Sequence, residues 1–159
     1  GLQTVERSDT ISLAALTEEV FCDLDPVAEK HQVRLIQTDG DCTVTGSYIL
    51  LYRAVYNLVE NAIKYNRPSG SVTVSIHSAE SAVLEVTDTG IGISLENQEK
   101  IFDPFYRVDK SRSRAMGGAG LGLALVSEIA RQHNGQVKVT QSSEKGSTIA
   151  LILPESTDY

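Results

Sequence analysis

The segment NLVENAIKYN, residues 57–66, places two asparagines four positions apart in an otherwise apolar stretch, with an acid and a lysine beside them. A helix advances about 100° per residue, so four polar side chains of this segment share one wedge of the helix surface. They are Glu60, Lys64, Asn57 and Asn61. The wedge borders the apolar row of Leu50 and Ala54, which predicts that the amides line a cleft. The alternative is a set of solvated or capped asparagines.

Amide oxygens give this wedge a specific chemistry. They are hard, neutral ligands that suit a Mg²⁺ ion, which keeps several waters and is otherwise held by nucleotide phosphates. Lys64 would add positive charge for those phosphates. We therefore expect a magnesium site at Asn61 and Asn57.

A second segment, DTGIGI, begins at Asp88, where a predicted strand ends. A carboxylate only accepts hydrogen bonds, and the glycines at 90 and 92 allow a flat ligand to approach the backbone closely. The exocyclic amine of adenine could donate to Asp88, whereas guanine would present an oxygen there. The alternative is a simple Asx turn followed by two glycines.

A third segment, GGAGLGLAL at 117–125, passes from a glycine-rich loop into a predicted helix. Successive N–H groups at a helix start can bind one anion, which predicts a phosphate site. A dinucleotide-binding fingerprint is disfavoured, because no strand precedes these glycines and their spacing differs. The preceding segment, IFDPFYRVDKSRSR, gathers Arg107, Lys110, Arg112 and Arg114, of which the last three fit a phosphate site and an exposed charged loop equally well.

Length and composition limit the remaining possibilities. With 159 residues and 41% hydrophobic content, the chain fits one domain with a proper core. Its net charge of −7 argues against a nucleic-acid binder. Cys22 and Cys42 have no metal-like spacing, so reduced thiols in a cytoplasmic setting are expected. No signal-peptide pattern and no apolar run of about 20 residues is present.

Hydrophobic periodicity and turn residues predict an α+β fold, a two-layer α/β sandwich whose mixed, mostly antiparallel sheet carries helices on one face. Ser47 is expected to cap the asparagine-bearing helix, and Ser94 a short helix reaching Ile101. We expect a mobile loop at 107–119. The other predicted helices are 13–28, with a kink at Pro26, and 121–133; the predicted strands are 33–36, 42–45, 72–76, 82–86, 137–140 and 148–153.

The segments NLVENAIKY, DTGIGI, IFDPFYRVD and GGAGLGLAL, in this order, resemble the catalytic and ATP-binding (HATPase) domain of bacterial two-component sensor histidine kinases. That domain has the Bergerat fold, which gyrase, heat-shock chaperone and mismatch-repair ATPases share. The resemblance implies a catalytic domain at 12–155, preceded at 1–11 by the end of a linker or helix and followed by a tail at 156–159.

The resemblance also implies roles for individual residues. Asn61 would coordinate Mg²⁺ with support from Asn57, and the adenine amine would bind Asp88. The implied catalytic residues are Asn61, Lys64, Arg107 and Glu60. The implied nucleotide-binding residues are Asn57, Asn61, Lys64, Tyr65, Asp88, Gly90, Gly92, Ile93, Tyr106, Arg107, Gly118, Gly120, Leu121, Gly122 and Ser147.

The family phosphorylates a histidine that is followed by an acid, but here His31, His77 and His133 precede Gln, Ser and Asn. We therefore expect ATP-dependent transfer to a separate dimerisation domain, which then serves a response regulator. The fragment would be monomeric, and its parent a membrane-anchored homodimer. The alternatives are another Bergerat ATPase or serine kinase, or an interaction module that binds no nucleotide.

Overall fold

The computed structural model describes residues 9–98, 100–103 and 122–156. The elements include two short 3₁₀ helices, η1 and η2. In chain order, all the elements are β1 (Asp9–Ser12), α1 (Leu13–His31), β2 (Arg34–Gln37), β3 (Thr43–Gly46), α2 (Tyr48–Lys64), β4 (Ser71–Ala79), β5 (Ser81–Asp88), η1 (Leu95–Asn97), η2 (Lys100–Phe102), α4 (Gly122–Gln132), β6 (Gln136–Ser143) and β7 (Gly146–Leu153).

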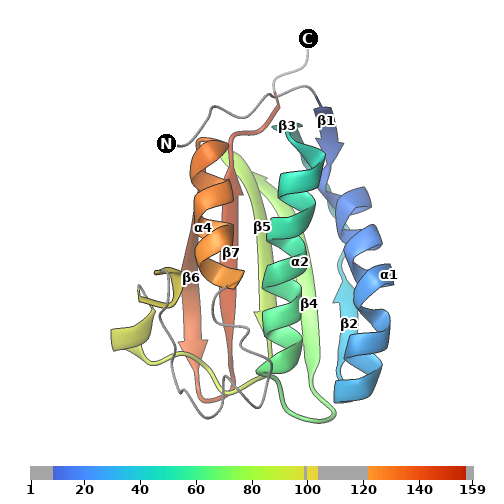
Figure 1. Ribbon diagram of the computed structural model, residues 1–159, viewed down its shortest axis with the longest axis vertical. Coiled ribbons are helices and arrows are strands. Elements are labelled where there is room, and N and C mark those ends of the chain that lie inside the picture. Colours follow the sequence, from blue (N-terminus) through green and yellow to red (C-terminus); the bar gives the residue numbers. More distant parts are fainter. Residues whose placement is uncertain (1–8, 99, 104–121, 157–159) are drawn as a thin grey trace.

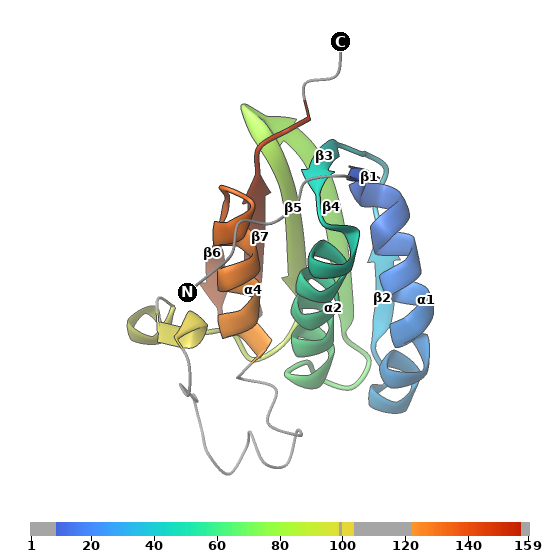
Figure 2. The ribbon, with the colours of Figure 1, turned by 45° about the horizontal axis from the view of Figure 1, so that its top comes forward.

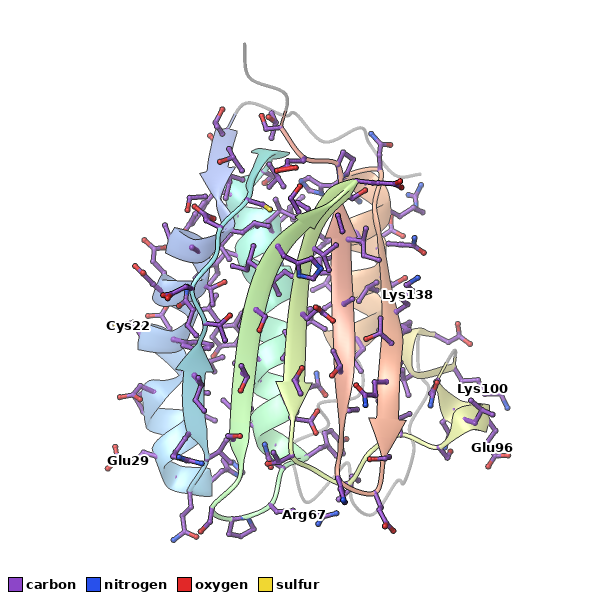
Figure 3. The ribbon with its side chains drawn as sticks, turned by 180° about the vertical axis from the view of Figure 1, so that it is seen from behind. Cys22, Glu29, Arg67, Glu96, Lys100 and Lys138 are labelled. Atoms are coloured by element: carbon purple, nitrogen blue, oxygen red, sulfur yellow. The ribbon has the colours of Figure 1, made fainter. Side chains whose placement is uncertain are left out.

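The sheet has five strands in the order β2-β4-β5-β7-β6 (Figure 1). β2 lies parallel to β4, and the other neighbouring strands are antiparallel. The helices α1, α2 and α4 form one layer in front of the sheet (Figure 2), and the view from behind looks onto its other face (Figure 3). The predicted two-layer sandwich with a mixed, mostly antiparallel sheet is therefore confirmed.

Apolar periodicity correctly identified the residues that join the two layers. Every second residue is buried from Val72 to Ile76 in β4 and from Ala82 to Val86 in β5, and so is the apolar stripe of α2, because these side chains share the space between sheet and helices. The stripe and the strand residues that were predicted to be buried are Leu51, Val55, Leu58, Ala62, Val72, Val74, Ile76, Ala82, Leu84 and Val86.

Helix boundaries follow the predicted caps in part. The Ser47 side chain accepts a hydrogen bond from the Leu50 N–H, as an N-cap residue should. α1 continues to His31, beyond the predicted end at 28, with Pro26 inside it. The predicted helix after Ser94 is wrong, since two 3₁₀ turns form there and Ser94 makes no side-chain cap bond.

One strand was not predicted. Residues 9–11, assigned from the sequence to a preceding linker or helix, form most of β1, which pairs with β3 in a separate two-stranded sheet. The Asp9 carboxylate accepts a hydrogen bond from the Tyr48 N–H, so this strand also contacts the start of α2. Such pairing depends on residues far apart in sequence, which periodicity does not reveal.

Within the described residues, no helix combines the length and apolarity needed to span a bilayer.

The buried imidazole of His133 joins two helices at their ends. His133 is 3% exposed; its Nδ1 lies 2.8 Å from the Ile129 carbonyl oxygen, and its Nε2 accepts a hydrogen bond from the Ser47 N–H at 3.1 Å. The proton therefore sits on Nδ1. Gly46 makes room for the ring, because a Cβ there would lie 2.4 Å from the imidazole Cδ2. His133 thus links the end of α4 to the N-cap of α2.

This link predicts a specific loss of stability. His133→Leu would leave the Ser47 N–H without its acceptor and would remove the imidazole from the Ile129 carbonyl, which keeps only the backbone N–H of residue 133. The free energy of unfolding should therefore fall by about 1–3 kcal/mol. Urea denaturation followed by circular dichroism measures this. His133→Gln, which can still present an acceptor to Ser47, should lose less. Equal stability of the Leu variant and the parent protein would contradict the link.

Candidate nucleotide-binding site

The predicted site residues that the structure describes come from elements that meet at one end of the sheet. The end of α2, the end of β5, the β6–β7 turn and the start of α4 lie together in the lower part of Figure 1. The Arg67 side chain, labelled in Figure 3, donates a hydrogen bond to the Glu144 carbonyl and so ties the connection after α2 to the β6–β7 turn. Segments that are far apart in sequence therefore surround one region.

Asp88 is held at this end of the sheet by both of its carboxylate oxygens. Oδ1 accepts the Gly90 N–H at 2.8 Å, and Oδ2 accepts the hydroxyl of Ser147 at 2.9 Å. Ser147 lies directly opposite Asp88 in the β5–β7 ladder and is buried. Burial raises the pKa of Asp88, and the hydrogen bonds from Gly90 and Ser147 oppose this rise. The Asx turn, which was the alternative interpretation, therefore accounts for the bond from Gly90 to Oδ1 but not for the bond from Ser147 to Oδ2.

Three glycines bring backbone segments close around Asp88. A Cβ at Gly90 would lie 2.4 Å from the Tyr65 carbonyl oxygen, and one at Gly92 would lie 2.0 Å from the Ser143 carbonyl oxygen. At Gly146, where φ is +138°, a Cβ would lie 1.9 Å from the Asp88 carbonyl oxygen. Only glycine permits these approaches. The Ile93 N–H, three residues after the DTG turn, donates to Ser142 Oγ at 2.6 Å.

Asn61 presents a buried amide oxygen. Its Nδ2 donates to the Asn57 carbonyl at 3.0 Å, and the residue is 7% exposed. Its Oδ1 has no hydrogen-bond partner among the described residues. A solvated amide, the alternative reading of the sequence, is therefore wrong for Asn61. An unpaired buried acceptor costs about 1–3 kcal/mol, so a bound cation or donor at this oxygen would relieve a real penalty.

The donors around Asn61 fit a magnesium ion that is held largely by phosphates. The described residues contain no group of three or more His, Cys, Asp or Glu side chains able to hold a metal. An amide oxygen with a second amide one helical turn away suits an ion that takes its other ligands from water and phosphate. Lys64 lies on the same wedge and pairs with Glu60 at 3.8 Å, which places an ammonium group beside the amides.

The structure covers the predicted site in part. It brings together Asn57, Asn61, Lys64, Asp88 and Ser147 through α2, β5 and β7. Tyr65 is the C-cap residue of α2, and Gly122 is the first residue of α4. The loop predicted at 107–119 lies outside the described residues, and so do five predicted ligands: Tyr106, Arg107, Gly118, Gly120 and Leu121.

Two residues that lie beside the site were not among its predicted residues. Asn66 was interpreted only as part of the signal that ends α2, and Thr89 was passed over between Asp88 and the glycines. In the structure, the Thr89 hydroxyl donates to Asn66 Oδ1 at 3.0 Å. Polar side chains adjacent in sequence to ligand residues are the only signal that could have pointed to this pair.

A helix-covered mixed sheet, with a carboxylate at a strand end and an unpaired amide oxygen on the adjacent helix, defines an ATP-binding domain of the Bergerat type. The family described as "Histidine kinase-, DNA gyrase B-, and HSP90-like ATPase" matches residues 46–157. The chain belongs to this family.

Named relatives are sensor kinases. The chain is 46% identical to the sensor-like histidine kinase SenX3 of Mycobacterium tuberculosis over 158 residues, which is 97% of this chain and 38% of SenX3. It therefore spans about two fifths of that relative. The mycobacterial sensor histidine kinase MprB superimposes with a TM-score of 0.78 at 26% identity, covering 94% of this chain and 99% of that one. Full-length ShkA, solved with AMPPNP, superimposes with a TM-score of 0.85 at 24% identity, over 99% of this chain and 33% of that one.

Asp88→Asn tests adenine binding and its pH dependence. The substituted amide would oppose at least one of the donors from Gly90 and Ser147, so ATP affinity should fall by about 1.5–3 kcal/mol. Protonation removes an acceptor from the carboxylate. Because burial raises its pKa, ATP binding by the parent should weaken on acidification at a higher pH than an ordinary aspartate would give.

Calorimetric titrations with ATP from pH 8 to pH 5 measure both effects. Protonation of the nucleotide itself is common to parent and variant, so the difference between them isolates Asp88. Equal affinity and equal pH dependence in the two proteins would refute the adenine assignment.

Asn61→Ala tests the metal assignment. Loss of the unpaired Oδ1 should weaken ATP binding in Mg²⁺ by at least about tenfold, and binding in excess chelator much less. Asn61→Asp, which keeps an oxygen at this position, serves as the matched control and should retain the Mg²⁺ dependence. Equal losses with and without Mg²⁺ for the Ala variant would indicate a packing role instead.

Proposed function

We propose that this domain binds Mg²⁺ and ATP and transfers the γ-phosphoryl group to a histidine of a separate domain, as the kinase part of a two-component sensor. The observation that carries the proposal is the 46% identity with SenX3 over 97% of the chain. This similarity extends over α1, which precedes the residues 46–157 that match the broader ATPase family. It therefore favours a histidine kinase over the other members of that family.

Each described site residue has a part in nucleotide binding. Asp88 accepts the adenine amine while Gly90 and Ser147 hold its carboxylate in place, and Tyr65 lies along the base. Asn61, with Asn57 beside it, would hold Mg²⁺. The ion would supply positive charge that neutralises the phosphates.

The other residues of the proposal act on the phosphates. Lys64 contacts them. The Glu60 carboxylate lies 3.8 Å from the Lys64 ammonium and so can influence how Lys64 meets the phosphates. From the sequence alone, Arg107 and the glycine-rich segment ending at Gly122 complete the phosphate site. Catalysis would consist mostly of positioning and charge neutralisation, because phosphoryl transfer requires little covalent chemistry from the protein.

The acceptor must come from elsewhere. His133 is buried, with both ring nitrogens engaged, and His77 lies 3.5 Å from Glu85 on β5. His31 is the last residue of α1. None of the three is followed by an acid. We propose that the acceptor lies in the dimerisation domain of a homodimeric, membrane-anchored parent, which passes the phosphoryl group to a response regulator.

Phosphotransfer to a separately expressed acceptor tests this division of labour. The fragment is incubated with γ-labelled ATP, Mg²⁺ and the dimerisation domain of its own parent. The acceptor should gain an acid-labile, base-stable phosphate, slowly, because the tether that supplies millimolar effective concentration is gone. The fragment alone should bind ATP and stay unlabelled, and Asp88→Asn should transfer far less.

Two outcomes would contradict the proposal. An acid-stable label on a serine of the fragment would indicate a serine kinase. Rapid ATP hydrolysis by the fragment without any acceptor would indicate an ATPase of another branch of the family.

A further inference from the structure

A ring of hydrogen bonds joins the end of α2 to the segment that follows Asp88. The Thr89 hydroxyl donates to Asn66 Oδ1 at 3.0 Å, and Asn66 Nδ2 donates to the Ser71 carbonyl at 2.9 Å. The Ser71 N–H closes the ring by donating to Thr89 Oγ1 at 2.9 Å. Asn66 Oδ1 also accepts the Arg67 N–H at 2.8 Å. Three separate segments of the chain therefore meet at two side chains.

The neighbouring glycines show how closely these segments approach. A Cβ at Gly70 would lie 2.2 Å from Asn66 Oδ1 and 2.5 Å from Thr89 Oγ1. A Cβ at Gly90 would lie 2.4 Å from the Tyr65 carbonyl oxygen and 3.2 Å from the Asn66 Cα. The absence of a side chain at Gly70 and at Gly90 therefore allows Asn66 and Thr89 to come within hydrogen-bond distance.

The residues on either side of this bond have different tasks. Asp88, directly before Thr89, bonds Gly90 and Ser147 and offers its carboxylate to adenine. Asn66 follows the C-cap of α2, the helix that carries Asn61 and Lys64. The bond between Asn66 and Thr89 therefore connects the base-binding segment to the helix that serves metal and phosphates.

We propose that Asn66 and Thr89 are positioning residues that determine selectivity for ATP over GTP. The proposal rests on the proposed nucleotide site. A carboxylate held in one place accepts the adenine amine and repels the guanine oxygen, whereas a carboxylate that can shift accommodates both. With the Asn66–Thr89 bond intact, Asp88 cannot move without moving the end of α2. Neither side chain needs to contact the nucleotide.

This effect is separable from overall stability. Asn66 is only partly buried and Thr89 is exposed, so their hydrogen bonds are accessible to water and contribute little to the free energy of unfolding. A merely structural role would lower the affinity for both nucleotides by the same factor. A positioning role lowers the affinity ratio of ATP to GTP.

Thr89→Val, which removes the hydroxyl and keeps the shape, is the principal test. Calorimetric dissociation constants for ATP and GTP should give an ATP-to-GTP affinity ratio about 5–10-fold lower than in the parent protein. Thr89→Ser keeps the hydroxyl and should preserve the ratio. Thr87→Val is the matched control, because its hydroxyl bonds Thr148 at 2.9 Å, away from the ring, and it should also preserve the ratio.

Asn66→Ala tests the coupling independently. It should lower the ratio as Thr89→Val does, and the double variant should lose no more than the larger single loss, because both changes break the same bond. An unchanged ratio in Thr89→Val, or fully additive losses in the double variant, would overturn the proposal. A parent domain that binds ATP and GTP equally would overturn the assignment of Asp88 as well, so the two failures are distinguishable.

Discussion

The half-buried carboxylate of Asp88 is the constraint on which the site depends. A carboxylate partly removed from water needs hydrogen-bond donors, and the fold supplies them from Gly90 and from Ser147 on the adjacent strand. This requires the β5–β7 register that places Asp88 opposite Ser147, and a glycine at 146, where the backbone passes 1.9 Å from the position of any Cβ. The sheet and the position of the carboxylate proposed to bind the base are therefore specified together.

The helix α2 is held at both of its ends by hydrogen bonds to residues of other elements. At its N-terminus, the His133 imidazole accepts the Ser47 N–H. At its C-terminus, Asn66 bonds Thr89 and Ser71. The buried stripe facing the sheet supplies most of the packing energy, so the helix tolerates the unpaired Asn61 Oδ1. An unsatisfied polar atom of this kind is expected where a ligand completes the structure.

Much of the fold could be predicted from periodicity alone. The alternation in β4 and β5 and the stripe on α2 identified the core, because each pattern has the repeat of one secondary structure. The failures share a cause. β1 exists through its pairing with β3, and the short helix after Ser94 became two 3₁₀ turns, since short segments have little intrinsic preference and take the conformation that distant contacts favour.

By itself, the sequence determined the chemistry that is available: two amides and a lysine on one helical wedge, a carboxylate at a strand end, and glycines where backbone must approach closely. These follow from residue types and local spacing, and they were sufficient for the resemblance to the kinase family. Only the tertiary structure decided which Asn61 atom has no hydrogen-bond partner among the described residues, that Ser147 bonds Asp88 directly, and that Asn66 meets Thr89. Each of these facts depends on the three-dimensional surroundings of a side chain, and those surroundings are built from residues that no local pattern relates.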